Sequence, residues 1–208
     1  MKKAVLFSII FIHSIYLYAH NAQLSTVALV QGKDSKWHLI LSASLTAYQI
    51  ELKNNIPSLN LDSLNADRFQ DLLLKHLRSK IKIVANGDYQ GILENGRVIL
   101  GHQTDINFEV SGMPQKLQLL DFQQLGFETL IDHYCIFKII SLENEPGSFI
   151  LQKDNKYNVV LKETNHVFMQ QTINNSLYST KTIGIGFFSL LIGFLFFIKF
   201  SNGKRHIG

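Results

Sequence analysis

Short stretches of alternating apolar and polar residues dominate the chain between residues 24 and 161. The clearest alternation covers residues 37–45, where one face would carry Trp37, Leu39, Leu41 and Ala43 and the other His38, Ile40, Ser42 and Ser44. Residues 46–52 are expected to continue this strand. Further strand candidates are 24–30, 81–85, 89–94, 97–101, 106–110, 116–122, 134–140, 148–152 and 157–161. Strands spaced about ten residues apart indicate a mainly β, antiparallel, Ig-like β-sandwich.

One segment breaks this pattern and predicts a single inserted helix over residues 66–79. Its apolar positions recur at helical spacing, at Phe69, Leu72, Leu73, His76 and Leu77. Asn65 stands before it as an N-cap, and the acidic Asp67 lies in its first turn. We expect the helix to pack on a sheet through Phe69, Leu73 and Leu77. Further along, Asn95-Gly96 predicts a hairpin turn, because both residues tolerate positive φ.

The N-terminal residues have the pattern of a secretory signal. Lys2 and Lys3 precede a mostly apolar stretch over residues 4–18, and Ala19 supplies a small residue at a cleavage point. Cleavage there would leave His20 as the first residue of the mature chain. The alternative is an uncleaved N-terminal anchor.

A second apolar segment, residues 183–198, contains no charged residue. As a helix it would be about 24 Å long, and its flanking residues extend the predicted transmembrane helix to 182–200. The alternative is a buried core helix. Lys199, Lys204 and Arg205 follow the span, and basic flanks stay in the cytoplasm. We therefore expect a single-pass inner-membrane protein with its domain outside and its C-terminus in the cytoplasm.

The expected organisation is a signal peptide (1–19), a periplasmic domain (20–164), a stalk (165–181), a transmembrane helix (182–200) and a cytoplasmic tail (201–208). Charge divides unevenly among these parts. Five of the 20 basic residues lie in the signal peptide, at the end of the span and in the tail, which leaves 15 outside against all 16 acidic residues. A net charge of −1 gives no basic face for nucleic acid. The expected partners are the lipid bilayer, through residues 182–200, and a membrane protein.

Motifs of common catalytic sites do not occur in the sequence. It has no Gly-x-Ser-x-Gly elbow, phosphate-binding loop, His-Glu-x-x-His motif or paired-cysteine zinc motif. The single cysteine, Cys135, lies in an apolar run and is expected to be a small buried hydrophobe. The pattern favours a binding or interaction module without catalytic activity. A hydrolase assembled from distant loops is the competing class.

Histidine suggests one further chemistry, a copper site. If His20 begins the mature chain, its α-amino group and ring Nδ1 can chelate one ion, and one more imidazole completes a three-nitrogen site suited to Cu(II). His102 is the first choice for that imidazole, because Gly101 beside it allows close approach. His38 is the reserve ligand. A frayed, unliganded His20 is the alternative.

Three stretches carry a resemblance to a known group of proteins: residues 37–49 (WHLILSASLTAYQ), residues 71–77 (DLLLKHL) and residues 100–105 (LGHQTD) leading into 108–110 (FEV). The chain resembles a family of uncharacterised exported proteins from Bacteroidetes, whose mature chains tend to start with His. The resemblance implies placement and fold class but no activity. A looser similarity is to periplasmic copper-handling β-sandwiches that begin with His, although their methionine-rich motifs are missing here.

Overall fold

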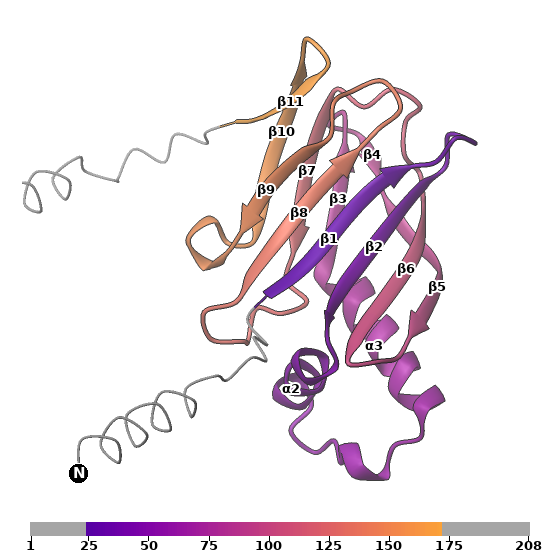
Figure 1. Cartoon of the computed structure of the whole chain (residues 1–208), viewed down its shortest axis with the longest axis vertical. Helices are drawn as coiled ribbons and strands as arrows, with labels where there is room; N and C mark the ends of the chain where they lie inside the picture. Colours follow the sequence, from indigo (N-terminus) through magenta and orange to yellow (C-terminus); the bar gives the residue numbers. More distant parts are fainter. Residues whose placement is uncertain (1–23, 172–208) are drawn as a thin grey trace, which may run out of the picture. The chain divides into compact units, whose positions relative to one another are not determined.

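The computed structural model describes residues 24–171 of the 208-residue chain. The predicted signal peptide, transmembrane helix and tail, together with His20, lie outside the described residues. Residues 24–171 form two β-sheets and two α-helices (Figure 1). This confirms the prediction of a mainly β, sandwich-like domain. Within these residues, no helix is long and apolar enough to cross a membrane.

The larger sheet has six strands. Their order is β5 (Ile92–Ile99), β6 (Gln103–Ser111), β2 (Trp37–Ser44), β1 (Leu24–Gln31), β8 (Tyr134–Ile140) and β9 (Gly147–Leu151). Neighbours are antiparallel except for β1 and β8, which are parallel with Leu24 opposite Tyr134. The expectation of a wholly antiparallel sandwich is therefore wrong at this pair. Alternation indicates which residues face inward, but it does not encode the direction of a neighbouring strand.

The smaller sheet has five strands and lies against the first. Their order is β11 (Val167–Gln170), β10 (Asn158–Thr164), β7 (Leu119–Gln124), β3 (Ile81–Ala85) and β4 (Tyr89–Gln90). The stalk was expected to begin at residue 165, but β11 pairs with β10 and its Phe168 is buried. The compact unit thus extends to Gln171. Two short 3-10 turns, η2 (Leu61–Ser63) and η3 (Lys153–Asn155), complete the described secondary structure.

Two helices are present where one was expected. Helix α3 (Ala66–Lys80) confirms the prediction: the Asn65 side chain accepts from the Arg68 N–H, and Phe69, Leu73 and Leu77 are buried. Helix α2 (Leu45–Asn55) occupies the segment that was expected to continue strand 37–45, so that prediction is wrong. Ser44 is the last residue of β2, and its hydroxyl caps α2 by accepting from the Ala47 N–H at 3.1 Å.

The Asn95-Gly96 pair is also not the hairpin turn that was expected. Both residues lie inside β5, at a register shift between Glu94 and Arg97, and Asn95 takes a positive φ of 46°. A Cβ on Gly96 would lie 2.6 Å from the Phe108 ring and 2.7 Å from Leu74. Glycine is needed here because α3 and β6 pack closely against the bulge, not because the chain reverses.

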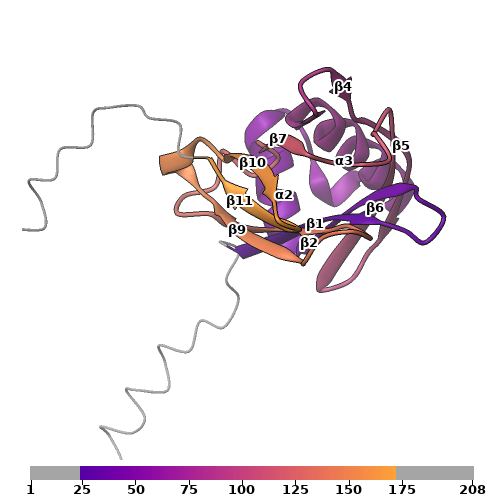
Figure 2. The same ribbon diagram turned by 90° about the horizontal axis from the view of Figure 1, so that it is seen from above.

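The core lies on the inner face of the six-stranded sheet. Over β8, the ring of Phe137 stacks on Phe122 of β7, with ring centroids 4.1 Å apart. At the β5–β6 side, α3 takes over, and the Arg78 guanidinium lies 5.3 Å from the Phe108 ring centroid (Figure 2). The second sheet and the helices thus cover the inner face between them and leave the opposite face of the six-stranded sheet turned outward.

Candidate interaction surface

The outward-facing positions of β1, β2, β8 and β9 are mostly apolar. We call the apolar ones, together with Lys138, the apolar sheet face, which consists of Leu24, Ala28, Val30, Ile40, Tyr134, Ile136, Lys138, Ile140 and Ile150. The other outward positions of these strands are polar and uncharged or carry histidine: Thr26, His38, Ser42, Ser44 and Ser148. Five large side chains of the apolar sheet face are between 37% and 60% exposed: Leu24, Ile40, Tyr134, Ile140 and Ile150. Soluble sheets usually present polar residues on a solvated face, so this composition is unusual.

Strand register makes these side chains one continuous surface. Leu24 lies opposite Tyr134, and Val30 lies opposite Ile140. On the other side of β8, Ile136 lies opposite Ile150. Directly opposed side chains on one face of a sheet are in contact range. The apolar sheet face is therefore a patch that runs across neighbouring strands, not a set of isolated hydrophobic residues.

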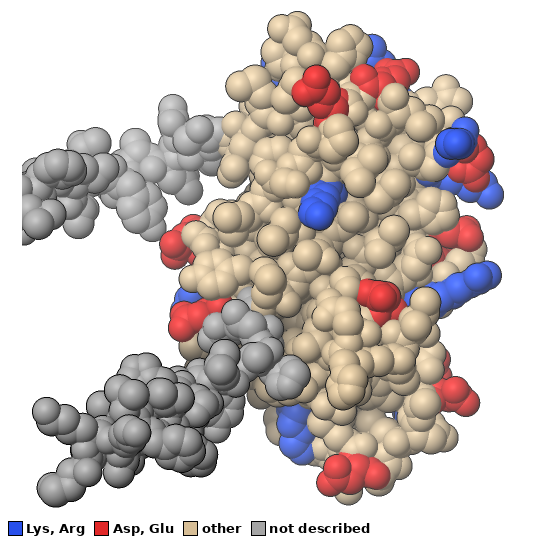
Figure 3. All heavy atoms as spheres, viewed as in Figure 1, with Lys and Arg blue, Asp and Glu red and all other residues tan. Residues whose placement is uncertain are grey.

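Charge is almost absent from this surface. Lys138 is the one Lys, Arg, Asp or Glu at the outward positions of β1, β2, β8 and β9. The next strands are different, since the same side of β6 carries Asp105 and Glu109, and β5 carries Glu94 and Arg97. Figure 3 shows this side of the molecule, with charged side chains mostly at its margins. Contiguous exposed apolar patches are typical of interaction sites, which makes this surface the candidate site.

A signal for this surface was present in the sequence but was not used. Residues 134–140 read Tyr-Cys-Ile-Phe-Lys-Ile-Ile, which is apolar at nearly every position instead of alternating. Such a run is typical of a strand that is covered on both faces. In the described structure β8 is covered on one face only: Cys135, Phe137 and Ile139 are buried inside.

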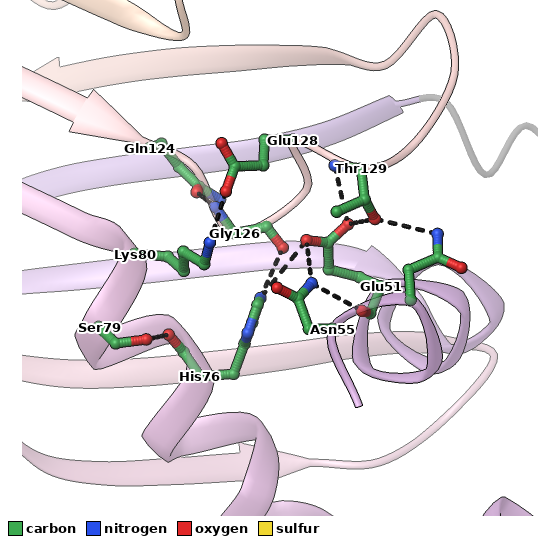
Figure 4. Close-up of polar contacts among 10 residues, drawn as sticks. Glu51, Asn55, His76, Ser79, Lys80, Gln124, Gly126, Glu128 and Thr129 are labelled. Atoms are coloured by element: carbon green, nitrogen blue, oxygen red, sulfur yellow. Dashed lines mark hydrogen bonds and ion pairs between the residues drawn. The ribbon is translucent and has the colours of Figure 1, made fainter. Parts of the chain in front are cut away.

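A second feature is a buried polar cluster between α2, α3 and the loop after β7 (Figure 4). The Glu51 carboxylate, only 1% exposed, accepts from the Thr129 hydroxyl at 2.5 Å and from the Asn55 amide at 2.9 Å. His76 Nε2 lies 3.7 Å from Glu51 Oε1 and 3.2 Å from the Gly126 carbonyl oxygen. The cluster ties together three segments that are far apart in the sequence.

Burial shifts both titratable groups of this cluster toward their neutral forms. It raises the pKa of Glu51, against the lowering effect of the hydrogen bonds from Thr129 and Asn55. It lowers the pKa of His76. Both effects follow from the cost of holding a charge away from water. His76 thus acts as the packed histidine of a helix stripe, and its contacts are structural.

A pocket of about 400 Å³ opens near Thr129, between the 128–134 loop and η3. Its carboxylates are Glu128, Asp132 and Asp154, and Tyr157 also lines it. Burial, followed by the negative charges of Glu51, Glu128 and Asp132, raises the pKa of Tyr157. Glu51, whose pKa is raised, is not among the residues that line this pocket.

The structure separates the two predicted imidazole partners of His20. His102 is exposed just before β6, and its carbonyl accepts from the Leu45 N–H at 3.0 Å. His38 lies opposite Glu109, six residue positions from the Ser44–Gln103 pair, which is about 20 Å along the sheet. The reserve ligand His38 thus lies far along the sheet from His102, and His20, which either ring would join, lies outside the described residues. Residues 24–171 contain no group of three side chains arranged to hold a metal ion.

Cys135 is 1% exposed, and burial raises its pKa to about 11. Its place in the core agrees with the prediction of a small buried hydrophobe.

Comparison with known proteins adds no assignment, since neither a scan of protein-family models nor a search of curated proteins finds a match. Fold and surface together define a class: a two-sheet β domain with one apolar, nearly uncharged outer face.

Proposed function

We propose that this protein is a membrane-anchored interaction module without catalytic activity, and that the apolar sheet face is its contact surface. The apolar sheet face is the observation that carries this proposal. Covering a large apolar side chain is worth about 1.5–3 kcal/mol when burial is complete. Five partly exposed side chains on one surface therefore provide a substantial driving force for contact with a second surface.

The proposed placement is periplasmic, on the inner membrane, with residues 182–200 as the anchor. It rests on the uncharged apolar segment and on the basic residues that follow it. Protease added to spheroplasts should digest the domain and leave an epitope on residues 201–208 intact. Digestion of that epitope would reverse the proposed orientation.

Thiol labelling in isolated membranes tests whether the apolar sheet face is covered. Ser148 is exposed on β9 beside Lys138, so Ser148→Cys reports on this face. Lys82 is exposed on β3 in the other sheet, so Lys82→Cys is the matched control. The native Cys135 can stay in place, because a buried thiol with a pKa of about 11 remains protonated and unreactive.

A water-soluble maleimide should label Lys82→Cys fast and Ser148→Cys slowly in membranes. Both variants should react at similar rates once the membranes are dissolved in a denaturant. Equal labelling of the two positions in intact membranes would remove the basis of the proposal.

Copper binding is a second candidate, favoured by strand register. Ser25 lies opposite Ala43, which lies opposite Thr104, so the start of β1 and His102 share one end of the sheet. Two strand spacings are about 10 Å, and the four residues from His20 to Leu24 span at most about 14 Å. The proposed ligands are the His20 amine, His20 Nδ1 and the His102 ring.

Calorimetry with Cu(II) tests this candidate. One residue added before His20 should abolish binding, His102→Ala should weaken it, and His76→Ala should leave it unchanged. Equal affinity in the extended chain would exclude the chelate.

A further inference from the structure

We infer that the surface covering the apolar sheet face is the phospholipid bilayer itself, with Lys138 placed against an anionic headgroup. This inference rests on the proposed function, because it assumes that the domain is anchored and that this face is its contact surface. It adds the identity of the occupant.

The composition of the apolar sheet face matches what a bilayer interface accepts. Its aliphatic side chains can enter the boundary between headgroups and acyl chains, and the ring of Tyr134 combines an apolar body with a polar tip. Lys138 is a cation on a long apolar stem, which can extend to a phosphate. The four strands place no carboxylate on this face, and the carboxylates on the same side of the sheet begin at β6, with Asp105 and Glu109.

Small neighbours leave room around Lys138. In its cross-strand row it lies between Ala28 on β1 and Ser148 on β9. The rows on either side contain larger aliphatic residues, Ile136 with Ile150 beside Thr26, and Ile140 with Val30 beside His38. A lysine between two small side chains, with isoleucines in the rows on either side, suits a phosphate headgroup whose acyl chains lie over the isoleucines.

Chain length keeps the domain close to the proposed membrane span. Ten residues, 172–181, separate Gln171 from the start of the span, and they reach at most about 35 Å. Such a tether raises the effective concentration of the bilayer surface at the domain, so weak contacts are sufficient for docking.

A second copy of the chain fits this surface less well. In a symmetric dimer the same patch meets itself, and each apolar sheet face would bring a Lys138 without a carboxylate to pair with it. Another protein with an acidic residue at the centre of an apolar surface would fit, and it is an outcome of the following test.

The test uses the full chain, purified and reconstituted at one copy per nanodisc, so that other proteins and second copies are excluded. Discs of phosphatidylcholine are compared with discs that also contain phosphatidylglycerol. In the anionic discs, maleimide should label Ser148→Cys about tenfold more slowly than Lys82→Cys, as expected for a face that is docked about 90% of the time.

Lys138 supplies the internal control. One lysine near an anionic surface is worth about 1 kcal/mol, which is about fivefold in docking. Lys138→Gln in the Ser148→Cys chain should therefore remove most of the difference between anionic and neutral discs, and Lys138→Arg should keep it. Protection that is equal in the two lipids would overturn the assignment of Lys138 to a headgroup.

The two proposals fail in different ways. If Ser148→Cys is protected in cell membranes but labels freely in anionic discs, the occupant is a protein, so the bilayer inference is wrong and the interaction module stands. If Ser148→Cys labels freely in both, the apolar sheet face is not a contact surface and both proposals are wrong.

Discussion

The two sheets of this domain have similar inner faces, and their outer faces differ in charge. Inside, both contribute aromatic and aliphatic residues, such as the stacked Phe122 and Phe137. Outside, the five-stranded sheet presents Lys82, Asp121 and Lys162 among apolar residues such as Val84, Val160 and Met169, and the Asn158 amide donates to Asp121 at 2.6 Å. The six-stranded sheet presents the apolar sheet face, with Lys138 as its one charge, on β1, β2, β8 and β9, and its other outward charges lie on β5 and β6. Folding requires only the inner faces, so this contrast in charge supports the proposed contact through the apolar sheet face.

The largest expected effect separates buried from merely apolar positions. Leu73 on α3 is fully buried, so Leu73→Asp places a carboxylate in the core without a partner and should unfold the domain, because the penalty of several kcal/mol approaches total stability. Ile150→Asp on the apolar sheet face should leave it folded. Circular dichroism with urea titration distinguishes the two. A folded Leu73→Asp variant would contradict the packing described for α3.

A smaller effect is expected at the contact between the sheets. Phe137→Ala removes the partner of Phe122 and should cost about 3–5 kcal/mol of unfolding free energy. Ile150→Ala, at a position that is 60% exposed, should change it by about 0.5 kcal/mol or less. Urea unfolding of both variants measures the difference. Comparable losses would mean that the apolar sheet face is part of the folding core, which would remove the contrast between the two outer faces.

The smallest expected effect is a pH dependence of folding stability that arises at His76, where α2 and α3 meet. Because burial lowers the pKa of His76, its neutral form stabilises the folded state above about pH 6.5, and this contribution is lost as pH falls through the folded-state pKa. The wild type should therefore lose stability relative to His76→Gln between about pH 7.5 and about pH 5. Glu51, with its raised pKa, acts in the opposite sense but is present in both proteins. A relative gain of the wild type on acidification would contradict this sign.

Local patterns predicted much of this fold. Strand 134–140 has the predicted bounds, and α3 differs from the predicted helix by one residue. Helix α2 was missed because Ala43, Leu45 and Ala47 continue the alternation of the preceding strand through its cap at Ser44. The Asn95-Gly96 pair was misread because its conformation depends on Phe108 and Leu74, which pack against it from distant segments.

The candidate sites were harder to predict, because they arise from contacts between distant segments. In the sequence Glu51 is an ordinary carboxylate on a helix, because its hydrogen-bond partner Thr129 lies 78 residues away. The apolar sheet face depends on β8 lying beside β1, a parallel pair that no local signal specifies. Composition alone could have identified strand 134–140 as apolar on both faces, but not which neighbours extend it into a patch.

Photo-crosslinking in living cells tests the central claim most directly. A benzoylphenylalanine introduced at Ile150, on the apolar sheet face, is compared with one at Lys162, which is exposed on the outer face of the other sheet. Irradiation should attach membrane material, lipid or protein, at position 150 and little at position 162. Equal crosslinking at the two positions, or none at position 150, would contradict the claim that the apolar sheet face is a contact surface.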